Sequence, residues 1–82
     1  SITQGWEGAG KKVWDERFGP WKPGNIGISG DRTQHVLWRI TEGKEIAGID
    51  PKAVVLMIGT NNVGSDSADD IAAGIAAIVR EF

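Results

Sequence analysis

The sequence predicts an α/β fold in which helices cover a parallel sheet. The main observation is residues 53–58, Ala-Val-Val-Leu-Met-Ile, an unbroken apolar run that follows Pro51 and precedes Gly59. A short run rich in β-branched residues is typical of a strand buried on both faces. A second short strand is predicted at residues 25–28. Segments with helical spacing lie before, between and after the two strands, which is the order that a parallel sheet requires.

Three segments have apolar residues at the spacing of amphipathic helices: residues 11–18, 32–41 and 67–82. The third begins at Ser67 and Asp70, whose spacing is that of a capping box with Asp in place of the usual Glu. The side chains predicted to face the core are Val13, Trp14, Phe18, Val36, Leu37, Ile40, Ile71, Ile75, Ile78, Val79 and Phe82.

The composition excludes several classes of function. The chain has no cysteine, so it holds neither a disulfide framework nor a thiolate metal site. Nine basic and eleven acidic residues give a formal charge of −2 with the signs mixed, so no nucleic-acid-binding or anionic-membrane surface is expected. No apolar stretch approaches the roughly 18 residues of a membrane-spanning helix, and the first residues do not form a signal peptide.

The number of predicted strands is small for the predicted fold. With 82 residues the chain is at most one domain. Two strands do not form a stable parallel sheet, which normally has more members and helices on both faces. We therefore expect residues 1–82 to be the N-terminal part of a single longer domain.

Three polar or glycine positions are suited to the chemistry of acyl transfer. Gly30 and Asn61 each follow a predicted strand, and Ser1 precedes a possible helix. The C-terminal ends of parallel strands meet at one edge of a sheet, so these residues can converge. Acyl transfer requires a hydroxyl nucleophile and hydrogen-bond donors aimed at the developing oxyanion. A serine, an unshielded glycine N–H and a carboxamide would supply these parts.

The same positions carry a family resemblance. Residues 1–5, Ser-Ile-Thr-Gln-Gly, look like the continuation of the Gly-Asp-Ser-Ile-Thr signature of the SGNH (GDSL) hydrolases, without the leading Gly-Asp. Residues 25–33 resemble the second block of that family, and Gly-Thr-Asn-Asn at 59–62 resembles the third, usually Gly-x-Asn-Asp. Residues 29–39, Ser-Gly-Asp-Arg-Thr-Gln-His-Val-Leu-Trp-Arg, resemble the branch that holds the platelet-activating-factor acetylhydrolase catalytic subunits and related bacterial esterases.

The resemblance implies a three-layer α/β/α, flavodoxin-like fold and a serine esterase that needs no metal or cofactor. It implies that Ser1 is the nucleophile. The Ser1 N–H, the Gly30 N–H and the Asn61 side-chain amide would form the oxyanion hole. The resemblance also implies a small acyl ester as the substrate, and an acetyl ester is expected. The family's first strand and its C-terminal Asp-x-x-His have no counterpart in this chain, so the segment alone is expected to be inactive.

Other conspicuous residues receive structural interpretations. His35 has no Asp three positions before it and is expected to be a structural residue on a helix face. Asn62 stands where the family more commonly has Asp, and its role is open. Of the four tryptophans, Trp14 and Trp38 are predicted to pack on their helices, whereas Trp6 and Trp21 are candidates for the wall of the site.

Two alternatives from other classes stay open at this point. Ser1 could act with its own α-amino group as base, as in N-terminal-nucleophile hydrolases. The chain could also belong to a non-catalytic α/β module that keeps the binding crevice. The acyl group, the alcohol moiety, the oligomeric state and the compartment do not follow from the sequence.

Overall fold

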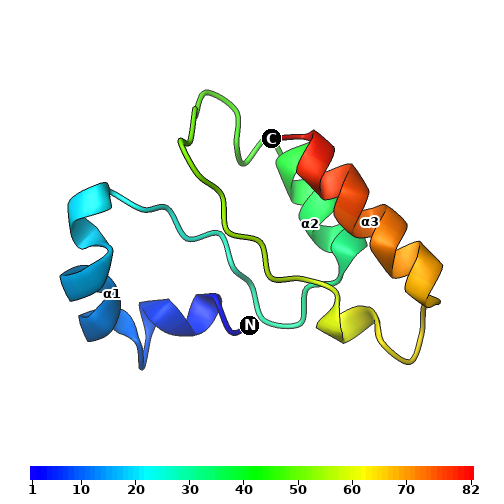
Figure 1. The fold of residues 1–82 in the computed structure, drawn as a ribbon, viewed down its shortest axis with the longest axis horizontal. Coiled ribbons are helices and arrows are strands. Elements are labelled where there is room, and N and C mark those ends of the chain that lie inside the picture. Colours follow the sequence, from blue (N-terminus) through cyan, green and yellow to red (C-terminus); the bar gives the residue numbers. More distant parts are fainter. The chain divides into compact units, whose positions relative to one another are not determined.

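The structure, a computed structural model, describes all 82 residues, which divide into two compact units, residues 1–30 and 31–82. Each unit is described separately. The first contains helix α1 (Lys11–Arg17) between the short 3-10 helices Gln4–Glu7 and Gly19–Trp21. The second contains α2 (Thr33–Ile40), the 3-10 turn Thr60–Asn62 and α3 (Ala68–Arg80) (Figure 1).

All three predicted helices are confirmed, with ends within two residues of the expected ones. The start of α3 follows its sequence signal, since the Ser67 side chain accepts a hydrogen bond of 3.1 Å from the Asp70 N–H. Acidic residues in its first turn and Arg80 in its last complement the helix dipole. None of the helices combines the length and apolar character needed to cross a bilayer.

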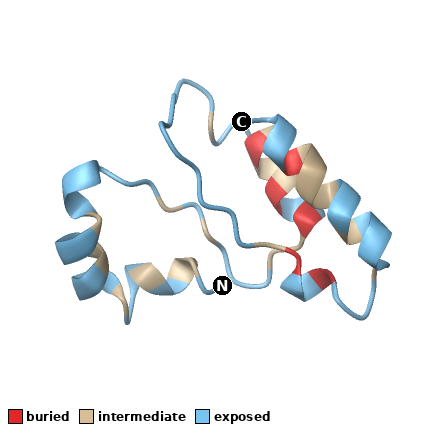
Figure 2. Cartoon of the chain, in the orientation of Figure 1, coloured by how far each residue is buried: buried red, intermediate tan, exposed pale blue.

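The core of the second unit lies between α2 and α3. Val36 and Ile40 of α2 are buried with Ile78 of α3, and half-buried apolar side chains surround them (Figure 2). Gly74 brings the helices close, because a Cβ atom there would lie 2.6 Å from the Thr33 Oγ1 atom. Val79 and Phe82 were predicted to face the core as part of the last helix, but both are exposed. The prediction for these two residues was wrong.

Aromatic rings pack against one another in the first unit. The rings of Trp6, Trp14 and Phe18 have centroids 5.5 to 6.1 Å apart, which confirms the packing role predicted for Trp14. Trp21 contacts Phe18 at 6.2 Å but is 78% exposed. The prediction for Trp38, a residue of the second unit, was wrong, because its side chain is 61% exposed.

The structure contains helices and no strand, so the predicted parallel sheet is not confirmed. Residues 25–28 and 53–58 form no strand, and the only bridge is an isolated one between Val63 and Asp66. A strand exists only through hydrogen bonds to a neighbouring strand, and neither segment has one here. Val55, at the middle of the apolar run, is 94% exposed as a result. The apolar pattern predicts burial but does not supply the partner that burial requires.

The contact at Gly74 leads to a test of helix packing. Replacing an exposed helical glycine by alanine normally stabilises a helix by about 1 kcal/mol. Here the added methyl group would overlap the buried Thr33, at a cost of about 1 to 3 kcal/mol. We expect Gly74→Ala to lower the melting temperature of the complete protein. Ala73→Gly, at an exposed neighbouring position, measures helix propensity alone. A higher melting temperature for Gly74→Ala would contradict the close packing.

Candidate active site

In the first unit, the start of the chain is hydrogen-bonded to the segment that leads to Gly30. Two bonds make this connection: Asn25 Nδ2 to the Thr3 carbonyl (2.7 Å) and the Ser29 N–H to Gln4 Oε1 (2.6 Å). Ser1 itself is exposed. The unit therefore ties residues 3 and 4, just after the candidate nucleophile, to the segment that ends at the candidate oxyanion glycine.

Gly27 makes this contact possible. A Cβ atom at this position would lie 2.7 Å from the Gln4 backbone nitrogen and 2.8 Å from the Thr3 Cβ atom. A side chain at position 27 would push this segment away from residues 3 and 4. The backbone atoms it would meet cannot move aside easily. Sequence reasoning assigned no role to Gly27, because a glycine spacing alone does not reveal which backbone approaches it.

Two glycines of the predicted motifs have left-handed backbone conformations. The φ angle is +84° at Gly30 and +111° at Gly59, values that side chains of L-residues disfavour. At Gly59 a Cβ atom would also lie 3.1 Å from the Ile71 Cγ2 atom of α3. At Gly30 no atom lies within 4 Å of the Cβ position. Gly30 is therefore required for its conformation, and the space beside it is open.

Asn61 presents its amide at the surface of the second unit. Its Nδ2 atom donates a hydrogen bond of 2.9 Å to the carbonyl of Asp31, and the residue is exposed. A carboxamide carries two N–H groups, so one stays available after this bond. Ser1 and Gly30 belong to the first unit and Asn61 to the second, and the convergence of all three stays a prediction.

Asn62, whose role the sequence left open, is buried and anchors the same turn. Only 1% of its surface is exposed. Its Oδ1 atom accepts the Thr33 N–H at 2.9 Å, which satisfies a free donor at the start of α2. Its Nδ2 atom lies within hydrogen-bond distance of Thr33 Oγ1 (3.2 Å), Gln34 Oε1 (3.0 Å) and Asp66 Oδ2 (2.7 Å). The two adjacent asparagines thus differ: Asn62 fixes the turn and Asn61 faces solvent.

His35 has a structural contact, as expected. Its Nδ1 atom accepts a hydrogen bond of 2.9 Å from the Arg32 N–H in the first turn of α2. No group of three or more His, Asp or Glu side chains gathers to form a possible metal site.

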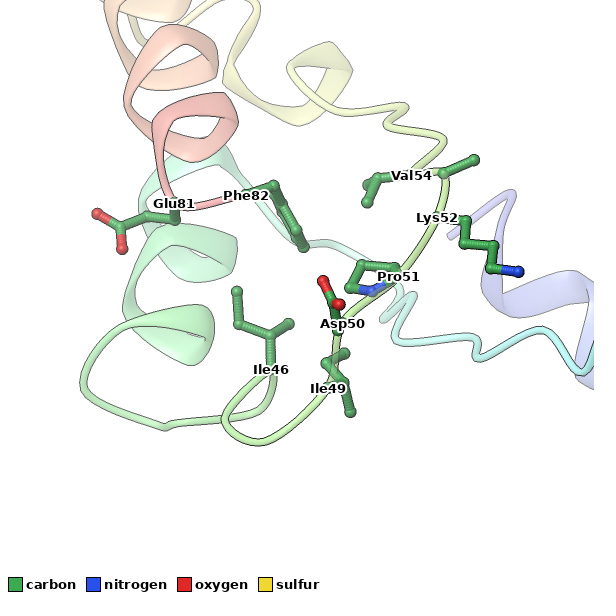
Figure 3. Close-up of a pocket in the computed structure, with 9 residues that line it drawn as sticks. Ile46, Ile49, Asp50, Pro51, Lys52, Val54, Glu81 and Phe82 are labelled. Atoms are coloured by element: carbon green, nitrogen blue, oxygen red, sulfur yellow. The ribbon is translucent and has the colours of Figure 1, made fainter.

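A pocket of about 270 Å³ in the second unit is separate from these residues. Figure 3 shows apolar side chains from the loop after α2 and Phe82, which follows α3, around it; the Asp50 carboxylate points in among them, whereas Lys52 and Glu81 point away. Its lining residues are Ile46, Ile49, Asp50, Pro51, Lys52, Ala53, Val54, Glu81 and Phe82. None of the candidate site residues is among them.

Comparisons with known proteins agree with the motifs. The model of the GDSL-like Lipase/Acylhydrolase family matches residues 1–82. Platelet-activating factor acetylhydrolase IB subunit alpha2 of Homo sapiens is 46% identical over 69 residues, and subunit alpha1 of Bos taurus is 49% identical over the same length. Each alignment covers 84% of this chain but 29% of the relative, so the chain spans less than a third of these relatives. No solved structure matches the chain significantly.

The buried amide of Asn62 gives a test of how the turn is held. In Asn62→Asp a carboxylate oxygen would replace the amide nitrogen that lies 2.7 Å from Asp66 Oδ2. We expect this change to lower the free energy of unfolding by about 1 to 3 kcal/mol, because a buried donor is lost and two carboxylates meet. The double variant Asn62→Asp/Asp66→Asn restores one donor to the pair and should recover most of the loss. Chemical denaturation of the complete protein measures both. A double variant no more stable than Asn62→Asp would show that the pair does not hold the turn.

Proposed function

The chain belongs to the GDSL-like lipase/acylhydrolase family, and from this premise we propose that the protein is a serine ester hydrolase that cleaves small acyl esters. Membership implies the α/β fold of the SGNH hydrolases. The family match over residues 1–82, with the three motif residues in order, carries the proposal. The relatives are named as acetylhydrolases, which favours an acetyl group as the acyl part of the substrate.

Within this proposal, Ser1 is the nucleophile. Its hydroxyl oxygen attacks the ester carbonyl, and the carbonyl oxygen becomes negative in the tetrahedral intermediate. The N–H groups of Ser1 and Gly30 and the side-chain amide of Asn61 donate to that oxygen. Collapse of the intermediate releases the alcohol and leaves an acyl-enzyme, which water then hydrolyses.

Two local arrangements support these roles. In the first unit, Thr3 and Gln4, which follow Ser1, are bonded to the segment that ends at Gly30, whose Cβ position has open space around it. In the second unit, the Asn61 amide is oriented by one hydrogen bond and keeps its other N–H available. Preorganised donors of this kind stabilise an oxyanion without reorganising during the reaction.

The fold of the complete domain is part of the same proposal. Residues 25–28 and 53–58 become strands of a parallel sheet, and a strand contributed from outside this chain lies between them. The base, a His that follows an Asp by three positions, also comes from another part of the domain. The segment alone has no positioned base, so it should not turn over esters. The family match favours this reading over an N-terminal-nucleophile hydrolase.

Covalent labelling tests the nucleophile. An organophosphonate should modify Ser1 in the complete protein, because only an activated serine hydroxyl attacks such a reagent. Peptide mass spectrometry locates the adduct, with Ser29, Ser65 and Ser67 as internal comparisons. Labelling that survives Ser1→Ala would overturn the assignment.

Steady-state kinetics on a nitrophenyl acetate test the oxyanion donor. Asn61→Ala should lower kcat about 10² to 10³-fold, because the lost donor acts mainly in the transition state. KM should change little, since the ground-state carbonyl gains less from that donor. Thr60→Ala, an exposed position in the same turn, is the matched control and should keep the parental kcat. An unchanged kcat in Asn61→Ala would remove Asn61 from the oxyanion hole.

A further inference from the structure

Arg39 of α2 is held between two carboxylates in the second unit. Its Nη2 atom lies 2.6 Å from Asp31 Oδ2, and its Nη1 atom donates to Glu45 Oε2. The side chains of Arg39 and Asp31 are only 13% and 14% exposed. The Nε atom of Arg39 is buried without a hydrogen-bond partner, so the two carboxylates alone fix the guanidinium group. Sequence reasoning assigned no role to any of these three residues.

Asp31 links this ion pair to the proposed oxyanion donor. Its carboxylate binds Arg39, and its backbone carbonyl accepts the hydrogen bond from Asn61 Nδ2 at 2.9 Å. The anchored side chain restricts the backbone of Asp31 and therefore the direction of its carbonyl. That carbonyl is the only hydrogen-bond partner of the exposed Asn61 side chain. Arg39, Asp31 and Asn61 thus form one chain of contacts.

We propose that Arg39 and Asp31 are positioning residues of the esterase reaction: their ion pair fixes the Asp31 carbonyl, which orients the Asn61 amide so that its second N–H points at the oxyanion. The inference rests on the proposed function, in which Asn61 is that donor. An oxyanion donor acts only within about 2.7 to 3.1 Å of the charged oxygen. A displacement of about 1 Å can cost about 10²-fold in rate, so the support of the amide matters as much as its presence.

The second carboxylate provides a matched control. Glu45 binds the same guanidinium group, but it does not touch Asn61 or the Asp31 backbone. Its own N–H donates to the Arg39 carbonyl at 3.0 Å, so its loop stays attached when the side chain is removed. Loss of either carboxylate leaves Arg39 with one partner. Only the loss of Asp31 releases the carbonyl that holds the Asn61 amide.

The experiment compares Asp31→Ala with Glu45→Ala in the complete protein, using nitrophenyl acetate kinetics and thermal melting. We expect Asp31→Ala to lower kcat about 10 to 10²-fold with little change in KM. Glu45→Ala should keep kcat within about twofold. This holds even if it lowers the melting temperature as much as Asp31→Ala does. Equal losses of kcat in the two variants, or no loss in either, would overturn the proposal. If Asp31→Ala does not fold, Asp31→Asn, which keeps the side-chain volume, takes its place.

A double-mutant cycle separates this inference from the proposed function. If Asp31 acts through Asn61, Asp31→Ala/Asn61→Ala should be no slower than Asn61→Ala. If the fold-loss of kcat in the double variant equals the product of the two single losses, the positioning role is overturned, while Asn61 remains a donor. An unchanged kcat in Asn61→Ala would instead refute the donor assignment itself.

Chemical rescue tests Arg39 directly. Millimolar guanidinium should restore part of the kcat lost in Arg39→Ala, because the free ion can pair with the Asp31 carboxylate. The same ion should not restore Asp31→Ala, which lacks that carboxylate. Rescue of both variants, or of neither, would contradict an action of Arg39 through Asp31.

Discussion

The hydrogen bonds of the buried Asn62 side chain fix the turn at residues 60–62 against α2. Its oxygen satisfies the Thr33 N–H at the start of that helix, and its nitrogen faces the Asp66 carboxylate at the end of the following loop. An amide so deeply buried is costly unless its donors and acceptors are paired, so the arrangement has few alternatives. The turn so fixed carries Asn61 at its surface, where the Asp31 carbonyl accepts a hydrogen bond from its side-chain amide.

The local features of the chain could be predicted from the sequence. Helix periodicity and the Ser67 cap depend on neighbours within four residues, so all three helices were found. Gly30 and Asn61 were identified as candidates because each follows a predicted strand and lies in a segment that resembles a family motif. The strands depend on a partner elsewhere, and the apolar pattern at 53–58 does not specify one. The exposure of Trp38 was missed for the same reason, since helical spacing does not say which faces are covered.

The supporting residues of the candidate site could not be predicted. Asn61 and Asn62 are chemically identical neighbours. The resemblance assigned Asn61 the donor role, and the structure shows that Asn61 is exposed and Asn62 is buried. Arg39 belongs to the segment 29–39 that carries the family resemblance, but the sequence assigns it no role of its own. Its significance comes from a bond to Asp31, eight residues away and outside the helix. Such contacts join segments that are separated in the sequence, and local sequence patterns do not show that these segments lie close together.

In the second unit, apolar packing joins the helices, whereas hydrogen bonds and an ion pair orient the Asn61 amide. Val36, Ile40 and Ile78 join α2 to α3 by burial, which is strong but indifferent to small rotations. The Asp31 and Asn61 contacts are directional, because a hydrogen bond weakens steeply when its angle falls. An oxyanion donor must be placed to within a few tenths of an ångström, and directional hydrogen bonds can hold it to that tolerance. Because these polar groups lie at the edge of the packed helices, a substitution there can change the orientation of Asn61 while the helical core stays intact.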